Sequence, residues 1–147
     1  MPAVADTHIV NRERVQPTHA NNYDSAHGGI VMKWMDEIGA MSAMRAAEQS
    51  CVTAQMSSVD FERPIPIGDN ALVESYAYAT GRTSVRVRIE VSAENPHTGE
   101  TERTTTAYAI FVAIEDGKPT AVPDLEVRGE KCKELREKAL TEEPERE

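Results

Sequence analysis

Asp36 is the residue of this sequence whose surroundings best suit chemistry. It lies in a stretch with helical periodicity, where its neighbours four residues before, four after and seven after are Met32, Ala40 and Ala43. A carboxylate among small apolar side chains is costly unless it is paired or functional. Such a group can act as a general base or as a nucleophile. The alternative is a structural ion pair with Lys33 or with a neighbouring subunit.

A second set of candidate groups stands at the start of the same helix. The turn His27-Gly28-Gly29 would place unpaired N–H groups and the positive end of the helix dipole there. Paired glycines let a ligand approach the backbone closely, although they could serve only to allow a sharp entry into the helix. His27 could simply form a hydrogen bond within the loop. Glu37 is a second acid, and its position near Lys33 favours an ion pair.

Arginines cluster once in the body of the chain, at Arg82, Arg86 and Arg88. Three are too few for duplex nucleic acid but enough for a phosphorylated small molecule. Thr83 and Ser84 would add hydroxyl donors beside Arg82. The alternative for this segment is a solvated hairpin without a ligand.

Periodic stretches predict the elements that hold these groups. Residues 30–48 form one long helix with apolar side chains on every side, which indicates a helix buried by the rest of the chain. Residues 85–91 alternate apolar with polar side chains, the period of a strand with one buried face. Further strands are expected at residues 7–15, 51–61, 70–79 and 103–114. Short turns make successive strands antiparallel, so we expect an α+β fold with a five-stranded sheet curved around one helix.

The C-terminal part of the chain is charged. Cys132, Leu135 and Ala139 form a thin apolar stripe that predicts a short surface helix at residues 129–140. Residues 141–147 are expected to be disordered. We therefore divide the chain into one domain at residues 1–128 and a charged helix and tail at residues 129–147.

Composition excludes several classes of function. The net charge of −9 disfavours nucleic acid as a partner. No apolar run approaches the ~18 residues that span a membrane, and the N-terminus has no signal-peptide pattern, so we expect a cytoplasmic protein. The two cysteines and four histidines lack the spacing of a metal site. The acidic composition would also fit a salt-adapted cytoplasm.

Several motifs together carry a resemblance to a known family. The segment 27–37, HGGIVMKWMDE, resembles cytosolic acyl-CoA hydrolases of the hot-dog fold, which carry a His/Phe-Gly-Gly turn and then a helix with Met-Asp or Met-Asp-Glu at this offset. VT at 52–53, VDF at 59–61, PI at 64–65, IGD at 67–69 and GRTS at 81–84 match in order, so the resemblance covers residues 21–113. Ser25 stands where many members have Asn or Asp, and Asp24 could take that place.

The resemblance implies a hot-dog fold and the hydrolysis of acyl-CoA to free fatty acid and coenzyme A. It implies that Asp36 is the base or nucleophile, that the Gly29 amide forms an oxyanion site, and that His27 and Asp24 complete the catalytic group. Gly28 and the segment Arg82, Thr83 and Ser84 would contact the substrate. No metal and no cofactor beyond the coenzyme A of the substrate are expected. Subunits would pair edge to edge in a dimer, with a trimer of dimers as the expected particle.

Two other functions are compatible with the same fold. A hot-dog enoyl-CoA hydratase uses an Asp and His pair at a wider spacing than Asp24 and His27. A non-catalytic acyl-CoA-binding protein would serve as a sensor, but no DNA-binding helix pair is evident in this sequence. Release of thiol from acyl-CoA separates the hydrolase from both alternatives.

Overall fold

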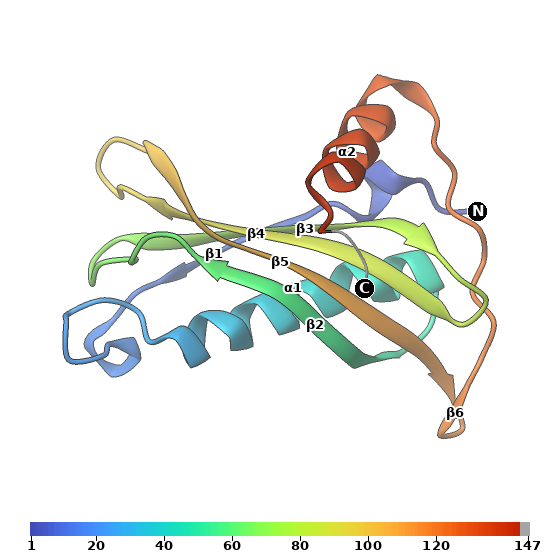
Figure 1. Ribbon diagram of the computed structural model, residues 1–147, viewed down its shortest axis with the longest axis horizontal. Coiled ribbons are helices and arrows are strands. Elements are labelled where there is room, and N and C mark those ends of the chain that lie inside the picture. Colours follow the sequence, from blue (N-terminus) through green and yellow to red (C-terminus); the bar gives the residue numbers. More distant parts are fainter. Residues whose placement is uncertain (145–147) are drawn as a thin grey trace.

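A computed structural model describes residues 1–144. One curved sheet separates two helices, with the long helix α1 (Gly28–Ala47) on its concave face and α2 (Gly129–Glu142) on its convex face (Figure 1). A short 3-10 helix η1 (Val4–Thr7) precedes the first strand, and a second, η2 (Pro17–His19), precedes the loop that leads to α1. No helix within residues 1–144 is long and apolar enough to cross a membrane.

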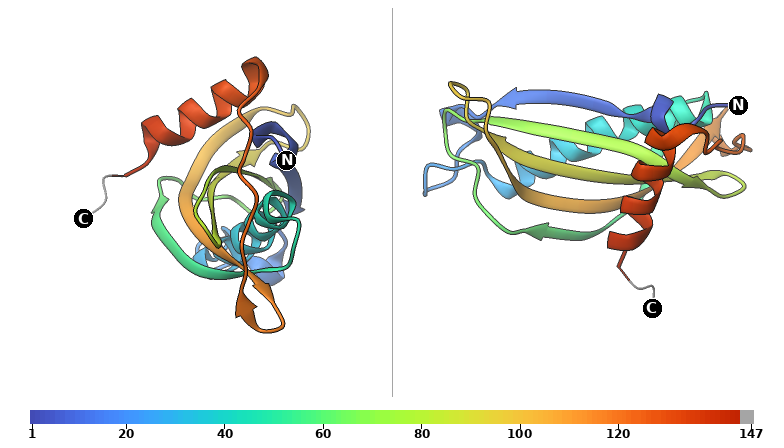
Figure 2. Two further views of the ribbon diagram at one scale, coloured as in Figure 1. Left: turned by 90° about the vertical axis from the view of Figure 1, so that its right-hand side faces the viewer. Right: turned by 90° about the horizontal axis from the view of Figure 1, so that it is seen from above.

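The sheet is antiparallel throughout, as predicted, with the strand order β1-β3-β4-β5-β2. Its strands are β1 (Ile9–Arg14), β2 (Cys51–Phe61), β3 (Asn70–Thr80), β4 (Ser84–Glu94) and β5 (Thr101–Glu115), and a two-residue strand β6 (Lys118–Pro119) pairs with β5. Strands β3, β4 and β5 follow one another as hairpins, whereas β2, which follows α1, forms an edge. The sheet wraps around α1 when viewed along that helix (Figure 2).

The main core lies between α1 and the concave face of the sheet. Met35, Ile38 and Phe111 are buried there. Gly39 marks the closest approach, because a Cβ atom at this position would lie 2.9 Å from Cδ1 of Ile89 and 3.3 Å from Cζ of Phe111. Glycine thus sets how deeply α1 sits in the sheet.

The expectation that this chain alone would bury α1 on all sides is wrong. Met32, Met41 and Met44 are 38%, 46% and 39% exposed. A sheet of this size covers one side of the helix and leaves the other side open. The apolar residues on that open side therefore require another cover or stay in contact with water.

Helix α2 packs against the sheet through the predicted stripe. Cys132, Leu135 and Ala139 are buried with Tyr76 and Tyr108 on the convex face. The Tyr76 hydroxyl donates to the Leu135 carbonyl (2.6 Å), and that of Tyr108 to the Ala139 carbonyl (2.8 Å). The predicted disorder from residue 141 is wrong for Thr141 and Glu142, which belong to α2; residues 145–147 lie outside the described residues. The domain division at residue 128 stays a prediction.

Candidate active site

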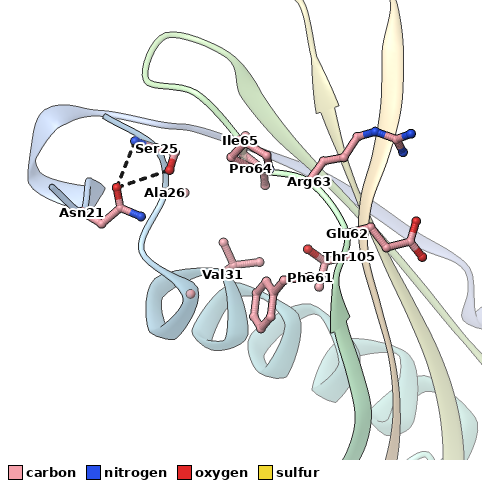
Figure 3. Close-up of a pocket in the computed structure, with 11 residues that line it drawn as sticks. Asn21, Ser25, Ala26, Val31, Phe61, Glu62, Arg63, Pro64, Ile65 and Thr105 are labelled. Atoms are coloured by element: carbon pink, nitrogen blue, oxygen red, sulfur yellow. Dashed lines mark hydrogen bonds between the residues drawn. The ribbon is translucent and has the colours of Figure 1, made fainter. Parts of the chain in front are cut away.

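A cavity of about 300 Å³ opens at the N-terminal end of α1 (Figure 3). Four segments form it: the loop before α1, the first turn of α1, the end of β2 with the residues that follow, and Thr105 of β5. Its lining residues are Asn21, Ser25, Ala26, Gly28, Val31, Phe61, Glu62, Arg63, Pro64, Ile65 and Thr105. The walls are mostly apolar with a few polar groups, as in small-molecule sites.

Asn21 is a cavity residue that the sequence analysis missed. Its Oδ1 atom accepts hydrogen bonds from the Tyr23 N–H (2.8 Å), the Ser25 N–H (3.3 Å) and the Ser25 hydroxyl (3.3 Å). The signal in the sequence was the spacing Asn-x-x-x-Ser, which suits a polar loop closed by side-chain bonds.

The turn at the start of α1 is built as predicted, but one of its amides is occupied. His27 is the N-cap residue, and its Nδ1 accepts from the Gly29 N–H at 3.1 Å. Gly28 lines the cavity, where an added Cβ would lie 3.6 Å from Cζ of Phe61. The Gly29 amide reaches a ligand only if His27 turns away or shares it, so its oxyanion role stays a prediction.

Asp36 lies near the middle of α1 and is partly exposed in the single chain. The expected partner Lys33 forms no ion pair with it among residues 1–144. The Thr53 hydroxyl of edge strand β2 instead donates to Asp36 Oδ1 at 2.5 Å. Asp36 lies seven residues beyond Gly29, which corresponds to ~10 Å along the helix axis.

The other candidate acids lie away from the cavity wall. Glu37 and Asp24 are exposed. Asp24 has a positive φ of 58° and contributes its backbone carbonyl to the Ile67 N–H. Asp24 is not among the residues that line the cavity, so its part in catalysis stays a prediction.

The predicted coenzyme A segment lies at the far end of the sheet from the cavity. Arg82 and Thr83 form the turn between β3 and β4, and Ser84 begins β4, beside the C-terminal end of α1 (Figure 1). Arg82 is exposed, and the Thr83 carbonyl accepts from the Ala113 N–H at 3.0 Å. One chain therefore cannot bring this segment to its own cavity.

The interpretation that Arg82, Arg86 and Arg88 form one cluster for a phosphorylated ligand is wrong for Arg86 and Arg88, because both are paired with glutamates. The Arg88 side chain is only 3% exposed and pairs with Glu90 (3.1 Å) and Glu142 (3.2 Å) beneath α2. Arg86 lies 3.5 Å from Glu143. Desolvation raises the pKa of Glu142, but Arg88 and Arg103 outweigh it and hold the pKa below its usual value. These arginines hold α2 against the sheet.

Comparison with known proteins agrees with this architecture. The thioesterase superfamily model matches residues 23–100. An uncharacterised acyl-CoA thioester hydrolase of Bacillus subtilis is 39% identical over 119 residues, which cover 80% of this chain and 69% of that protein. A hexameric acyl-CoA thioesterase has a TM-score of 0.85 at 36% identity, covering 95% of this chain and 90% of that one.

A Staphylococcus aureus acyl-CoA hydrolase has been solved in complex with butyryl coenzyme A, coenzyme A and coenzyme A disulfide. It has a TM-score of 0.85 at 28% identity and covers 95% of this chain and 85% of that one. The same protein has been solved with an asparagine, an aspartate or a threonine replaced by alanine.

The present chain thus has the hot-dog fold and belongs to the thioesterase superfamily. It is a thioesterase, as the motifs around Gly28 and Asp36 predicted.

Proposed function

We propose that this protein hydrolyses acyl-CoA thioesters to a carboxylic acid and coenzyme A, with the Asp36 carboxylate as the general base or nucleophile. The similar proteins of Bacillus subtilis and Staphylococcus aureus, named for this activity, support the substrate class. The observation that carries the proposal is the contact between Asp36 and Thr53 beside an open edge strand.

The Staphylococcus aureus variants support the choice of residues. Their replaced asparagine, aspartate and threonine are separated by 15 and 17 residues. Asn21, Asp36 and Thr53 have the same residue types and the same separations in this chain. Asn21 thereby joins the proposed site. It is better suited than Asp24 to take the role of the Asn or Asp that many family members have at the position of Ser25.

The Asp36 carboxylate is arranged for either form of catalysis. The Thr53 hydroxyl fixes Oδ1, and no described residue holds Oδ2, so this second oxygen is left for a water molecule or for the thioester carbon. As a base, Asp36 takes a proton from water as the water oxygen attacks the carbonyl carbon; the C–S bond then breaks, and the proton passes to the leaving sulfur of coenzyme A. As a nucleophile, it attacks the carbonyl carbon, the C–S bond breaks and coenzyme A leaves as the thiolate; water then hydrolyses the resulting anhydride to the free acid and restores the carboxylate.

A single subunit cannot bring all these groups to one thioester, because Asp36 is ~10 Å along the helix from Gly29. A two-fold axis between antiparallel α1 helices would place Asp36 of one subunit beside the helix start of its partner. The same rotation carries the segment of Arg82, Thr83 and Ser84 toward the partner's cavity, where it would bind the coenzyme A phosphates.

The open edge β2 and the exposed methionines of α1 support such a pairing. We propose a dimer as the minimum active unit. A trimer of dimers is the expected particle, since the similar acyl-CoA thioesterase is hexameric. The proposed reaction needs no metal or cofactor, and we propose a cytoplasmic location without a nucleic-acid or membrane partner.

The direct test is release of thiol from a series of acyl-CoAs, read with a thiol reagent and confirmed by mass spectrometry of the free acid. The proposal predicts turnover that is proportional to enzyme. Binding of acyl-CoA without thiol release would contradict it and favour a non-catalytic binding protein. Addition of water to an enoyl-CoA without loss of the thioester would favour a hydratase.

A further inference from the structure

The loop between η2 and α1 is closed into a ring by Asn21 and Ser25. The Ser25 N–H and hydroxyl both donate to Asn21 Oδ1 at 3.3 Å, and the Asn21 N–H donates back to the Ser25 carbonyl at 2.8 Å. Two side-chain contacts and one backbone contact thus join the same two residues. Such a closed set of bonds fixes the amide orientation as well as the backbone.

This ring decides which end of the Asn21 amide a ligand meets. A side-chain carbonyl oxygen has two lone pairs, and three donors already surround this one. The Nδ2 amino group has no acceptor among residues 1–144, and it lies on the side of the cavity (Figure 3). Asn21 therefore presents hydrogen-bond donors, and a ligand must supply the acceptor.

Ser25 is the fixed member of the pair. It is 7% exposed, whereas the nearby Tyr23 is 88% exposed. Ser25 forms a β-bridge with Pro66, and the next residue, Ala26, donates its N–H to the Ile65 carbonyl at 2.8 Å. The backbone at Ser25 is thus held by the body of the protein, and its hydroxyl reaches Asn21 from that fixed position at the cavity wall.

The competing donor at this site is already in use, because the Gly29 N–H donates to His27 Nδ1. A thioester carbonyl oxygen in the cavity would find the Asn21 amino group unpaired. We propose that Ser25 is a positioning residue: it holds Asn21 so that Nδ2 donates to the thioester oxygen as negative charge develops there. This inference rests on the proposed function and adds a residue to it.

The test compares Ser25→Ala, Ser25→Thr and Asn21→Ala with wild type, and uses Asn22→Ala as the control for a nearby exposed loop position. Loss of one oxyanion donor costs ~10²–10³-fold in kcat, which we expect for Asn21→Ala. Ser25→Ala should lower kcat by roughly tenfold with KM nearly unchanged, because two N–H donors to Oδ1 remain. Ser25→Thr keeps the hydroxyl and should restore kcat. In the Asn21→Ala background, Ser25→Ala should cost nothing more.

A crystal structure of Ser25→Ala supplies a readout that does not depend on activity. We expect the Asn21 amide to rotate or to occupy more than one conformation. An unchanged amide, an unchanged kcat, or an equal loss of kcat in the Asn21→Ala background would each overturn the positioning role. Absence of thiol release by the wild-type protein would instead contradict the proposed function, and the amide conformation would still decide whether Ser25 orients Asn21.

Discussion

The Thr53 hydroxyl donates to Asp36 Oδ1 at 2.5 Å, and this contact joins the middle of α1 to the open edge of the sheet. A hydrogen bond to a carboxylate fixes the direction of that carboxylate. The contact lies beside the side of α1 that the sheet leaves uncovered, where a second subunit would bring its own helix start.

Thr53→Ala should lower kcat more than it alters KM, because the carboxylate loses its orientation while the proposed coenzyme A contacts remain. We expect a loss of about 10-fold or more, comparable to one hydrogen bond to a charged group. Thr53→Ser keeps the hydroxyl and should retain most activity. Steady-state kinetics on both variants measures this, and equal activity in Thr53→Ala and wild type would remove the threonine from the mechanism.

Met44→Glu should weaken assembly. Met44 is 39% exposed in the single chain, and burying an unpaired carboxylate in a subunit interface is costly. Light scattering should show a smaller particle than wild type, with activity lost in parallel. Lys118→Glu, at an exposed position of the two-residue strand β6, is the control. A wild-type protein that is strictly monomeric and fully active would contradict the proposed dimer.

Glu48→Gly should stabilise the protein. Glu48 ends α1 with φ 57° and ψ 28°, a left-handed conformation that costs a non-glycine residue ~1–2 kcal/mol. We expect a gain of about 1 kcal/mol in the free energy of unfolding, measured by chemical denaturation. Glu37→Gly, within the same helix, should instead lose ~1 kcal/mol. Equal effects of the two substitutions on the free energy of unfolding would contradict a left-handed conformation at Glu48.

The attachment of α2 should weaken in acid. The pKa of Glu142 lies below its usual value of 4.5, so its ion pairs stabilise the fold fully above that value. This stability is lost as pH falls through the lowered pKa of the folded state. Glu142→Gln should cost about 1 kcal/mol at neutral pH, because Arg88 is buried but keeps its pair with Glu90, and less once Glu142 is protonated. Thermal melts across pH measure this, with Glu137→Gln as the exposed control. A pH-independent cost would contradict the ion-pair role.

Local patterns predicted most of the fold. The alternation at residues 85–91 predicted the strand that the structure places at Ser84–Glu94, and the Gly28-Gly29 turn predicted the start of α1. The predictions that were wrong concerned residues whose surroundings depend on contacts with distant parts of the sequence. The pairing of Arg88 with Glu142 joins residues 54 positions apart, and an exposed arginine and a buried one look alike in a strand pattern.

The candidate site could likewise be predicted only where local sequence was enough. The helical neighbours of Asp36 singled out that carboxylate, but its partner Thr53 comes from another element. Ser25 was noticed only as a departure from the family pattern, because a sequence does not show which polar loop residues bond to one another. The uncovered side of α1 was missed because apolar residues on every side of a helix do not reveal whether the same chain or a second one buries them.

The most direct measurement is the turnover of folded Asp36→Asn together with its melting temperature. Asparagine keeps the shape and can still accept from the Thr53 hydroxyl, but an amide is a poor base and a poor nucleophile. We expect kcat to fall by ~10²–10⁴-fold, with a melting temperature close to that of wild type and coenzyme A affinity nearly unchanged. A lower melting temperature with turnover per folded molecule within a few-fold of wild type would contradict the account and leave Asp36 a structural residue.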